Sequence, residues 1–387
     1  MKNSKRNFNL GNALYFLILL VFVILFVNIL VPYTRTFLHE QGHRWLFILL
    51  FSSSLSFTVT PWVRYLAKKV NILDHPDDRK VHHQATPLLG GIAIYIAFVS
   101  SIFINNIYTK PLLGILIGGT IVFLISVVDD IIEIPAGLKL LVQFLATSII
   151  IGSGIVLDLF PETPLGLAGN IFLTFLWVIG ITNSFNFFDG MDGLASGLGI
   201  ITAFFIGIVA FQTDQPFLGW IAIAVMGSCI GFLPYNFRLH KPATIFLGDA
   251  GSNFLGFTLA SLAIFGDWAD NNPIVSLATP LLIFWIFVFD MTHITLTRII
   301  SGKVTNLKEW INYVGKDHLH HRLEFLLKSK KQSVLFIFFL CACMGISAIV
   351  LRYARTVDAI LLVIQAAIIV ILVTILEAIA KKQANKG

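Results

Sequence analysis

Acidic side chains end one of the apolar runs of this sequence. Asp129 and Asp130 follow the run 111–128 in the letters VVDDIIEI. Successive helical residues diverge by about 100°, so one carboxylate should face the interior and the other the adjoining loop. A helix carboxyl end disfavours an anion by about 0.3–1 kcal/mol. The pair therefore needs a neighbouring cation, unless both are merely solvated loop acids.

Four oxygen-bearing side chains recur at intervals of three: Asn183, Asn186, Asp189 and Asp192. This near-helical repeat predicts one face lined with oxygen donors. Oxygen ligands without cysteine suit a hard ion such as Mg²⁺. In the alternative interpretation, Asp189 lies at a helix end and Asp192 caps the next helix. Two amides inside an apolar run need partners, however, which weakens that alternative.

Asp249 lies in the small-residue segment FLGDAGS, directly before the apolar run 251–266. It could cap that helix. A helix amino end with small residues is also a favourable place for phosphate. The two interpretations are compatible.

A cluster of cations occupies the largest basic segment: His318, His320, His321 and Arg322. Zinc is a weak interpretation, because no cysteine is near and the spacing is not the i, i+4 pair of a zinc helix. Cations that grip diphosphate oxygens and stabilise a departing phosphate fit better, and a solvated basic loop is the alternative. Asp290, isolated in an apolar run, could pair with Arg298 or line the site.

The segment 74–91 mixes acids and bases before a glycine pair. It contains Arg79, Lys80 and His82. Alone, such a charge run indicates no more than a solvated face.

The composition identifies the setting of these residues. The 387 residues are 57% hydrophobic and 12% charged, with mean hydropathy +0.85. Soluble domains carry about 45–50% apolar and about 25% charged residues. The chain is therefore not an ordinary soluble enzyme, a disordered protein or a nucleic-acid binder. Its three cysteines indicate neither a disulfide framework nor a zinc ribbon.

The pattern predicts an all-α, polytopic membrane bundle of about 10–12 helices in a single domain, 1–387. A bilayer core needs about 20 apolar residues per helix. The candidate spans are 12–31, 45–66, 89–106, 111–128, 138–157, 170–188, 194–211, 217–235, 251–266, 274–297, 333–351 and 356–379.

Positive charges orient this bundle. With the amino terminus inside, one set of loops holds 22 of the 27 Lys and Arg residues and the other set holds 5. The positive-inside rule places the first set in the cytoplasm, together with both termini. The acidic and histidine motifs fall on the same side. Since ionisable groups near membrane depth are costly, we expect them to meet in one cytoplasmic cleft.

Carboxylates, a cation cluster and small-residue turns are the groups that phosphoryl transfer requires. Positioning and charge neutralisation supply most of that catalysis, and a metal can bridge two phosphates. These residues therefore indicate metal-dependent transfer between a lipid phosphate and a soluble anionic donor.

The ordered motifs, from about Asp74 to Leu323, resemble those of the polyprenyl-phosphate N-acetylhexosamine-1-phosphate transferases. The resemblance implies transfer of a sugar-1-phosphate from a UDP-N-acetylhexosamine to undecaprenyl phosphate, with release of UMP. It implies Mg²⁺, with Mn²⁺ as a substitute, and a multi-pass protein of the inner or plasma membrane. It also implies a lipid-open cleft at the cytoplasmic face, ten or eleven spans and a homodimer.

The resemblance also implies roles for single residues. Asp129 and Asp130 look like the pair that handles the lipid phosphate, one of them removing its proton. Lys139 resembles a phosphate-contacting lysine, and Phe246 a residue that stacks on uracil. Asn186 and Asp249 look like Mg²⁺ ligands, and Asp189 and Asp192 like an acidic motif near the nucleotide. His318, His320 and His321 resemble a motif that contacts the diphosphate. Further substrate contacts are expected from Asn183, Arg79, Lys80, His82 and Arg322.

Two motifs distinguish branches of that family. Residues 318–321 read HLHH and residues 88–91 read LLGG. The peptidoglycan translocase branch typically carries P-x-x-H-H-H and Thr-Met-Gly-Gly, so the chain resembles the branch that uses UDP-N-acetylglucosamine for a cell-envelope polysaccharide. The pentapeptide translocase is one alternative. An ion-coupled transporter is another, but it would place carboxylates near the midplane within repeats.

Overall fold

The computed structural model describes residues 32–74, 85–269, 272–313, 315, 317–351 and 354–384. The predicted span 12–31 and the candidates Arg79, Lys80 and His82 lie outside these residues. The helices are α2 (Pro32–Glu40), α3 (Arg44–Lys69), α4 (Gly90–Ile104), α5 (Lys110–Ile131), α6 (Ala136–Gly152), α7 (Pro164–Phe187), the 3₁₀ turn η1 (Phe188–Gly190), α8 (Leu194–Gln212), α9 (Pro216–Asn236), α10 (Gly248–Phe265), α11 (Pro273–Ile283), α12 (Trp285–Ile300), α13 (Leu307–Asn312), α14 (Leu319–Leu327), α15 (Lys330–Val350) and α16 (Thr356–Ala384).

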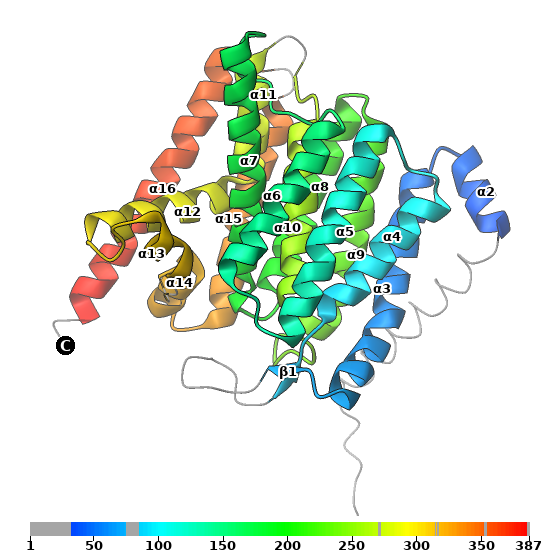
Figure 1. The fold of residues 1–387 in the computed structure, drawn as a ribbon, viewed down its shortest axis with the longest axis horizontal. Coiled ribbons are helices and arrows are strands. Elements are labelled where there is room, and N and C mark those ends of the chain that lie inside the picture. The colour runs from blue at the N-terminus through cyan, green and yellow to red at the C-terminus, as the bar shows by residue number, and fades with distance from the viewer. Residues whose placement is uncertain are drawn as a thin grey trace, which may run out of the picture.

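The all-α prediction is confirmed, since nearly every element in the described part of the chain is a helix. Each predicted span from 45 onward coincides with one helix, except 274–297, which is divided between α11 and α12. Seven helices of the described residues are long and apolar enough to cross a membrane, and the bent pair α11–α12 would make eight. The helices α4 and α6 are shorter apolar helices. Figure 1 shows most of the long helices running side by side as a bundle.

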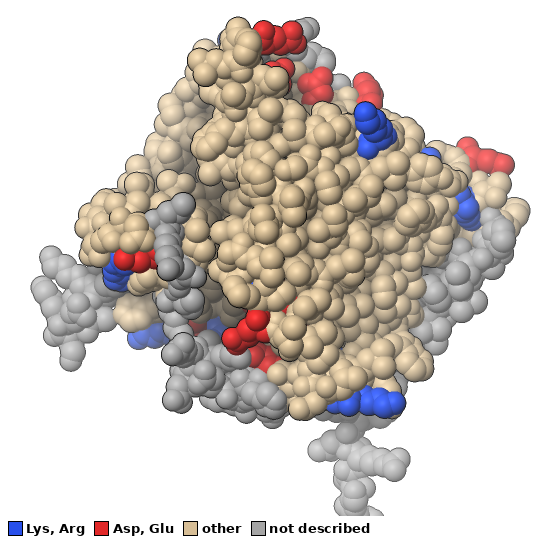
Figure 2. Space-filling view, in the orientation of Figure 1, with Lys and Arg blue, Asp and Glu red and all other residues tan. Residues whose placement is uncertain are grey.

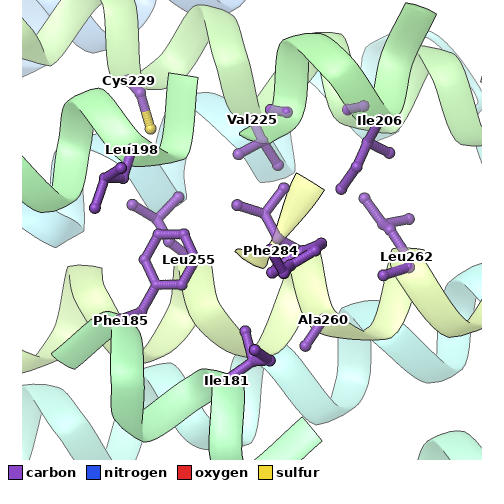
Figure 3. Close-up of a cluster of buried hydrophobic side chains, with 14 of the residues drawn as sticks. Ile181, Phe185, Leu198, Ile206, Val225, Cys229, Leu255, Ala260, Leu262 and Phe284 are labelled. Carbon is purple, nitrogen blue, oxygen red and sulfur yellow. The ribbon is translucent and has the colours of Figure 1, made fainter. Parts of the chain in front are cut away.

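Helix α10 forms the centre of this bundle. Almost all of its residues are buried, and it packs against α4, α5, α7 and α8. Small residues allow the close approach: a Cβ on Gly251 would lie 2.9 Å from Cα of Gly91 on α4. In Figure 3, side chains from α7, α8, α9 and α10, and from the residue between α11 and α12, meet in one apolar cluster. Those labelled are Ile181, Phe185, Leu198, Ile206, Val225, Cys229, Leu255, Ala260, Leu262 and Phe284.

The prediction of one continuous span over 274–297 is wrong. The chain turns by 80° between α11 and α12, at Phe284, whose φ of −99° and ψ of 11° are not helical. The residues after the bend explain it. Asp290 and Arg298 would be costly in lipid on a straight span; on the bent α12 both are buried within the protein.

Short elements occur where the sequence predicted only loops. The segment 32–44, between two predicted spans, contains α2, and the basic segment between α12 and α15 contains α13 and α14. The two-residue strands β1 (Leu73–Asp74) and β2 (Thr86–Pro87) pair antiparallel. On the face shown in Figure 2, a wide uncharged band separates charged side chains near the two ends of the bundle.

Candidate active site

A cleft of about 1470 Å³ opens where α5 and α7 end and α10 begins. Eight residues singled out from the sequence line it: Asp129, Asp130, Lys139, Asp189, Asp192, Phe246, Asp249 and His321. They come from segments that are far apart in sequence and meet at helix ends. The structure thus brings the acidic motifs together with one member of the histidine motif.

The two adjacent aspartates have different surroundings. Both carboxylate oxygens of Asp130 accept hydrogen bonds from the amino end of α10, from the Asp249 N–H at 2.8 Å and the Ala250 N–H at 3.1 Å. Asp129 instead accepts one bond from the Ile134 N–H at 2.8 Å and contacts Lys139. The expected divergence of the pair is present. Asp130 is held by α10, and Asp129 remains beside the cation.

Gly248 makes the cap by Asp130 possible. Its φ of +77° lies in the left-handed region, which L side chains rarely adopt. A Cβ at this position would also lie 2.6 Å from an Asp130 carboxylate oxygen. A glycine is therefore required where α10 begins.

Lys139 supplies the cation that the acidic pair needs. Its ammonium contacts Asp129 and lies 3.1 Å from Oδ2 of Asp249. The lysine lies in the first turn of α6, the helix after Asp129, whereas Asp249 lies on α10. This position between two carboxylates shows that the cleft accommodates a cation there.

Asp249 is also tied to α7. The Asn186 amide donates to Oδ1 of Asp249 at 2.9 Å and to the Ser252 hydroxyl at 3.1 Å. Within the described residues, no three His, Cys, Asp or Glu side chains form a complete metal cage. Mg²⁺ commonly takes one or two carboxylates and completes its shell with water and substrate phosphates. Asp249 and its neighbours fit that donor chemistry, provided Asn186 turns its amide oxygen to the ion.

The predicted single face of four oxygen donors does not form. Helix α7 ends at Phe187, Asp189 lies in η1, and Met191 is extended with φ −139° and ψ 145°. Asn183 lies deeper on α7 and donates to Gln143 on α6 at 2.7 Å. A regular helix would have spread the two aspartates along its side; the turn directs both to the cleft.

Asp192 does not cap the following helix. The Asp192 carboxylate accepts from the Ala243 N–H at 2.8 Å, while the cap position of α8 is Gly193. This bond ties the turn after η1 to the segment that carries Phe246.

The histidine motif divides between the cleft and the interior. His321 lines the cleft, while His318, His320 and Arg322 are buried. The His320 ring lies against Gly190, where a Cβ would meet its Nε2 at 2.7 Å. Burial first, and then the nearby His321, His318 and Arg322, lower the pKa of His320 well below its ordinary value. His320 is therefore a neutral imidazole at neutral pH.

Asp290 does not pair with Arg298, which was one of its two predicted roles. Arg298 makes a two-pronged ion pair with Asp317, at 2.7 and 2.9 Å. Burial alone would raise the pKa of Asp317, but the Arg298 guanidinium lowers it below the usual value. Asp290 lies 2.7 Å from Nδ1 of His318 and accepts from the Leu319 N–H at 2.7 Å.

Lys330 and Lys331 line the same cleft, although sequence reasoning used them only as markers of orientation. Both occupy the first turn of α15, where cations oppose the helix dipole. Lys331 is held by the carbonyl oxygen of Leu239 at 2.5 Å. Two cations at the amino end of a helix are unfavourable unless an anion lies near them, so this pattern in the sequence could have indicated an anion-binding site.

Comparison with known proteins finds one transferase family, both by a family model and by individual relatives. Residues 112–267 match the model of glycosyl transferase family 4. A Bacillus subtilis (strain 168) protein named "probable undecaprenyl-phosphate N-acetylglucosaminyl 1-phosphate transferase" is 35% identical over 303 residues, covering 76% of this chain and 82% of that protein.

Two further relatives carry similar names. The decaprenyl-phosphate N-acetylglucosaminephosphotransferase of Mycolicibacterium smegmatis is 30% identical over 320 residues, covering 75% of this chain and 77% of its own length. The undecaprenyl-phosphate alpha-N-acetylglucosaminyl 1-phosphate transferase of Escherichia coli K12 is 27% identical over 325 residues, with 80% and 83% covered.

Proposed function

Because this chain belongs to glycosyl transferase family 4, we propose that it transfers N-acetylglucosamine-1-phosphate from a UDP-sugar to undecaprenyl phosphate. UMP is the second product, and the lipid-linked sugar begins a cell-envelope polysaccharide. The observation that carries the proposal is Lys139 between Asp129 and Asp249, in a cleft that also holds His321, Lys330 and Lys331.

Two chemically different sets of residues line the cleft. One set is the carboxylates of α5, η1 and α10, and the other is His321 with the lysines of α15. A diphosphate has several negative oxygens and is attracted to the cations. It needs a bridging cation to approach the carboxylates, because like charges repel. The charge pattern therefore suits a diphosphate donor with a divalent ion.

The acceptor phosphate is the nucleophile in the proposed reaction. Its oxygen bonds to the phosphorus that carries the sugar, and the bond from that phosphorus to the bridging oxygen breaks. The bridging oxygen leaves with UMP. If the acceptor carries a proton, Asp129 is the member of the acidic pair placed to take it: one Asp129 oxygen is bound to a backbone N–H and the other faces Lys139, whereas backbone N–H groups bind both Asp130 oxygens.

Lys139, His321 and the lysines of α15 stabilise negative charge during this exchange. Cations that are preorganised in a cleft of the protein act more strongly than in bulk solvent. Phe246 lines the cleft beside the carboxylates and provides an aromatic face for the uracil. Asp189 and Asp192 line the same cleft, and we assign them to the nucleotide.

The residues that would hold Mg²⁺ are Asp249 and Asn186, with Mn²⁺ as a substitute. When bound, such an ion polarises the phosphoryl oxygens and neutralises their charge. The protein contributes the fixed position of Asp249, which Asp130 secures through the backbone and Asn186 through the side chain.

The proposal includes a location and an assembly. The protein is a multi-pass membrane protein. We place it in the plasma (inner) membrane with the cleft at the cytoplasmic face, supported by the excess of Lys and Arg in the loops on that side. The homodimer stays a prediction from the family resemblance.

The direct test uses the purified full-length protein in lipid nanodiscs with undecaprenyl phosphate and UDP-N-acetylglucosamine radiolabelled in the sugar. The expected result is a labelled lipid product and stoichiometric UMP. EDTA should abolish both, and Mg²⁺ should restore them. Asp129→Asn is the inactive control.

Two changes to this assay distinguish the proposed transferase from the peptidoglycan translocase and from an ion-coupled transporter. UDP-N-acetylmuramoyl-pentapeptide as the better donor would indicate the peptidoglycan translocase. Solute uptake into vesicles without any lipid-linked product would indicate the transporter and overturn the proposal.

A further inference from the structure

Asp290 is a fully buried carboxylate in an otherwise apolar stretch of α12. Its exposed fraction is 0%, and its neighbours along the helix read WIFVFDM. A buried charge is costly unless it is paired and hydrogen-bonded. The proposed reaction uses no group on α12, so the partners of Asp290 require their own explanation.

Each carboxylate oxygen of Asp290 has a partner on the chain that leads into α14. Oδ2 lies 2.7 Å from Nδ1 of His318, and Oδ1 accepts from the Leu319 N–H at 2.7 Å. His318 is the cap position of α14, yet its own side chain makes no capping bond. The acceptor that a cap residue would normally supply to the first turn comes instead from another helix.

The contact also determines which histidine nitrogen carries the proton. A carboxylate only accepts hydrogen bonds, so His318 must carry a proton on Nδ1. A carboxylate that holds an imidazole this way fixes both its tautomer and its orientation. The other charged group facing Asp290 is Arg322, with its guanidinium 3.8 Å from Oδ1. Arg322 in turn lies 3.2 Å from His293 of α12.

The fixed turn carries the one member of the histidine motif that reaches the cleft. The His321 N–H donates to the His318 carbonyl at 3.0 Å, so His321 belongs to the same first turn of α14. Its side chain lines the cleft. A displacement of His318 or of the Leu319 N–H would move His321 directly.

We propose that Asp290 is a positioning residue: it holds His318 in the Nδ1–H tautomer and seats the first turn of α14, so that His321 faces the substrate diphosphate. The proposal rests on the proposed function for the identity of that diphosphate. It makes the bent helix α12 a support of the donor site, although α12 contributes no residue to the cleft in the described part of the chain.

The first test reads the tautomer and needs no activity. Protein labelled with ¹⁵N-histidine in lipid bilayers is examined by solid-state NMR, and the His318 signals are assigned by their loss in His318→Gln. The expected wild-type signal is a neutral Nδ1–H imidazole or an imidazolium. In Asp290→Asn, the amide can still accept from the Leu319 N–H, but its nitrogen donates to Nδ1. The His318 signal should become that of the Nε2–H tautomer.

The matched control is Asp317→Asn, which weakens the ion pair of the same segment with Arg298 of α12 and keeps the Asp290 carboxylate as the partner of His318. It should leave the His318 signal unchanged. A wild-type Nε2–H tautomer, or the same tautomer in wild type and Asp290→Asn, would overturn the proposal.

The second test asks whether Asp290 acts through His321. Asp290→Asn should lower kcat/KM for the UDP-sugar by about 10–100-fold. This is the range seen when the hydrogen-bond partner of a metal-ligating histidine is removed. In the His321→Ala background the same substitution should have little further effect. A full additional loss in that background would show that Asp290 acts elsewhere and contradict the proposal. Wild-type protein that makes no lipid product would contradict the proposed function alone, because the tautomer result would stand.

Discussion

The Asp130 carboxylate caps α10 from a different helix: its Oδ1 accepts the backbone N–H of Asp249 at 2.8 Å. The bond joins the end of α5 to the start of α10 and involves the peptide of the same residue whose side chain meets Lys139. Adjacent aspartates thus have separate tasks. One fixes the backbone at Asp249, and the other faces its carboxylate across the lysine.

Asp130→Ala should therefore destabilise the protein as well as inactivate it. Loss of a helix-capping side chain costs about 0.5–2 kcal/mol, and Asp130→Asn, which keeps one acceptor oxygen, should cost less. Thermal unfolding in detergent, followed by fluorescence-detected size exclusion, measures this. Asp129→Asn is the comparison and should abolish turnover with a small change in the unfolding temperature. Equal unfolding temperatures for Asp130→Ala and the wild type would contradict the capping role.

Lys139→Met should reduce turnover by about 10²–10³-fold, the loss seen when one preorganised donor is removed from a transition state. The same variant should bind a divalent ion more tightly, because the ammonium no longer shares the two carboxylates. Electron paramagnetic resonance of free Mn²⁺ measures that affinity without any substrate.

Lys110→Met is the control for this prediction, since Lys110 begins α5 at the end far from the cleft. It should change neither quantity. Weaker Mn²⁺ binding in Lys139→Met would show that the lysine does not compete with the ion.

Lys330→Gln and Lys331→Gln should raise KM for the UDP-sugar more than KM for the lipid. Both lysines line the cleft. The attraction between their charges and a soluble anion falls with ionic strength. The variants should also show a weaker salt dependence of kcat/KM for the donor. Initial rates between low and high NaCl test this. Lys328→Gln, at an exposed position nearby, provides the control, and an equal effect there would attribute the result to general surface charge.

Stability should fall as the pH is lowered through the ordinary range of histidine, and His320 should contribute to that fall. Its pKa in the folded protein is lowered by burial and by the neighbouring cations. The unfolded chain therefore binds more protons, so the stabilisation is complete above the unfolded pKa, about 6.5, and is lost as pH falls toward the folded value. Unfolding temperatures of wild type and His320→Gln between pH 8 and pH 5 measure this. A parallel decline in both would contradict it.

The meeting of the acidic motifs in one cleft could be predicted because a membrane restricts where polar groups can lie. Asp129, Asp189 and Asp249 stand at the ends of apolar runs, where charges cost least, and runs that share an orientation bring such ends to one face. The length of the apolar runs was equally direct: each predicted span in the described part of the chain is helical, although 274–297 forms two helices.

Pairings between distant segments could not be predicted. The spacing of Asn183 to Asp192 suggested one helical face, but the chain turns at η1, and Asp192 bonds to Ala243 of a distant segment. The bend at Phe284 is accompanied by the contact of buried Asp290 with His318. Such contacts leave no periodic trace in one sequence. Lys330 and Lys331 were missed for another reason, because orientation alone explained their charge.

The acidic and most of the cationic residues of the cleft are synthesised at different times. Each carboxylate that lines it in the described residues lies at or before Asp249, whereas His321, Lys330 and Lys331 follow much later in the chain. During synthesis, Lys139 is the one cation among the described lining residues that is already present when α10 has been inserted. The described cationic lining of the cleft is complete only when α14 and the start of α15 have been made.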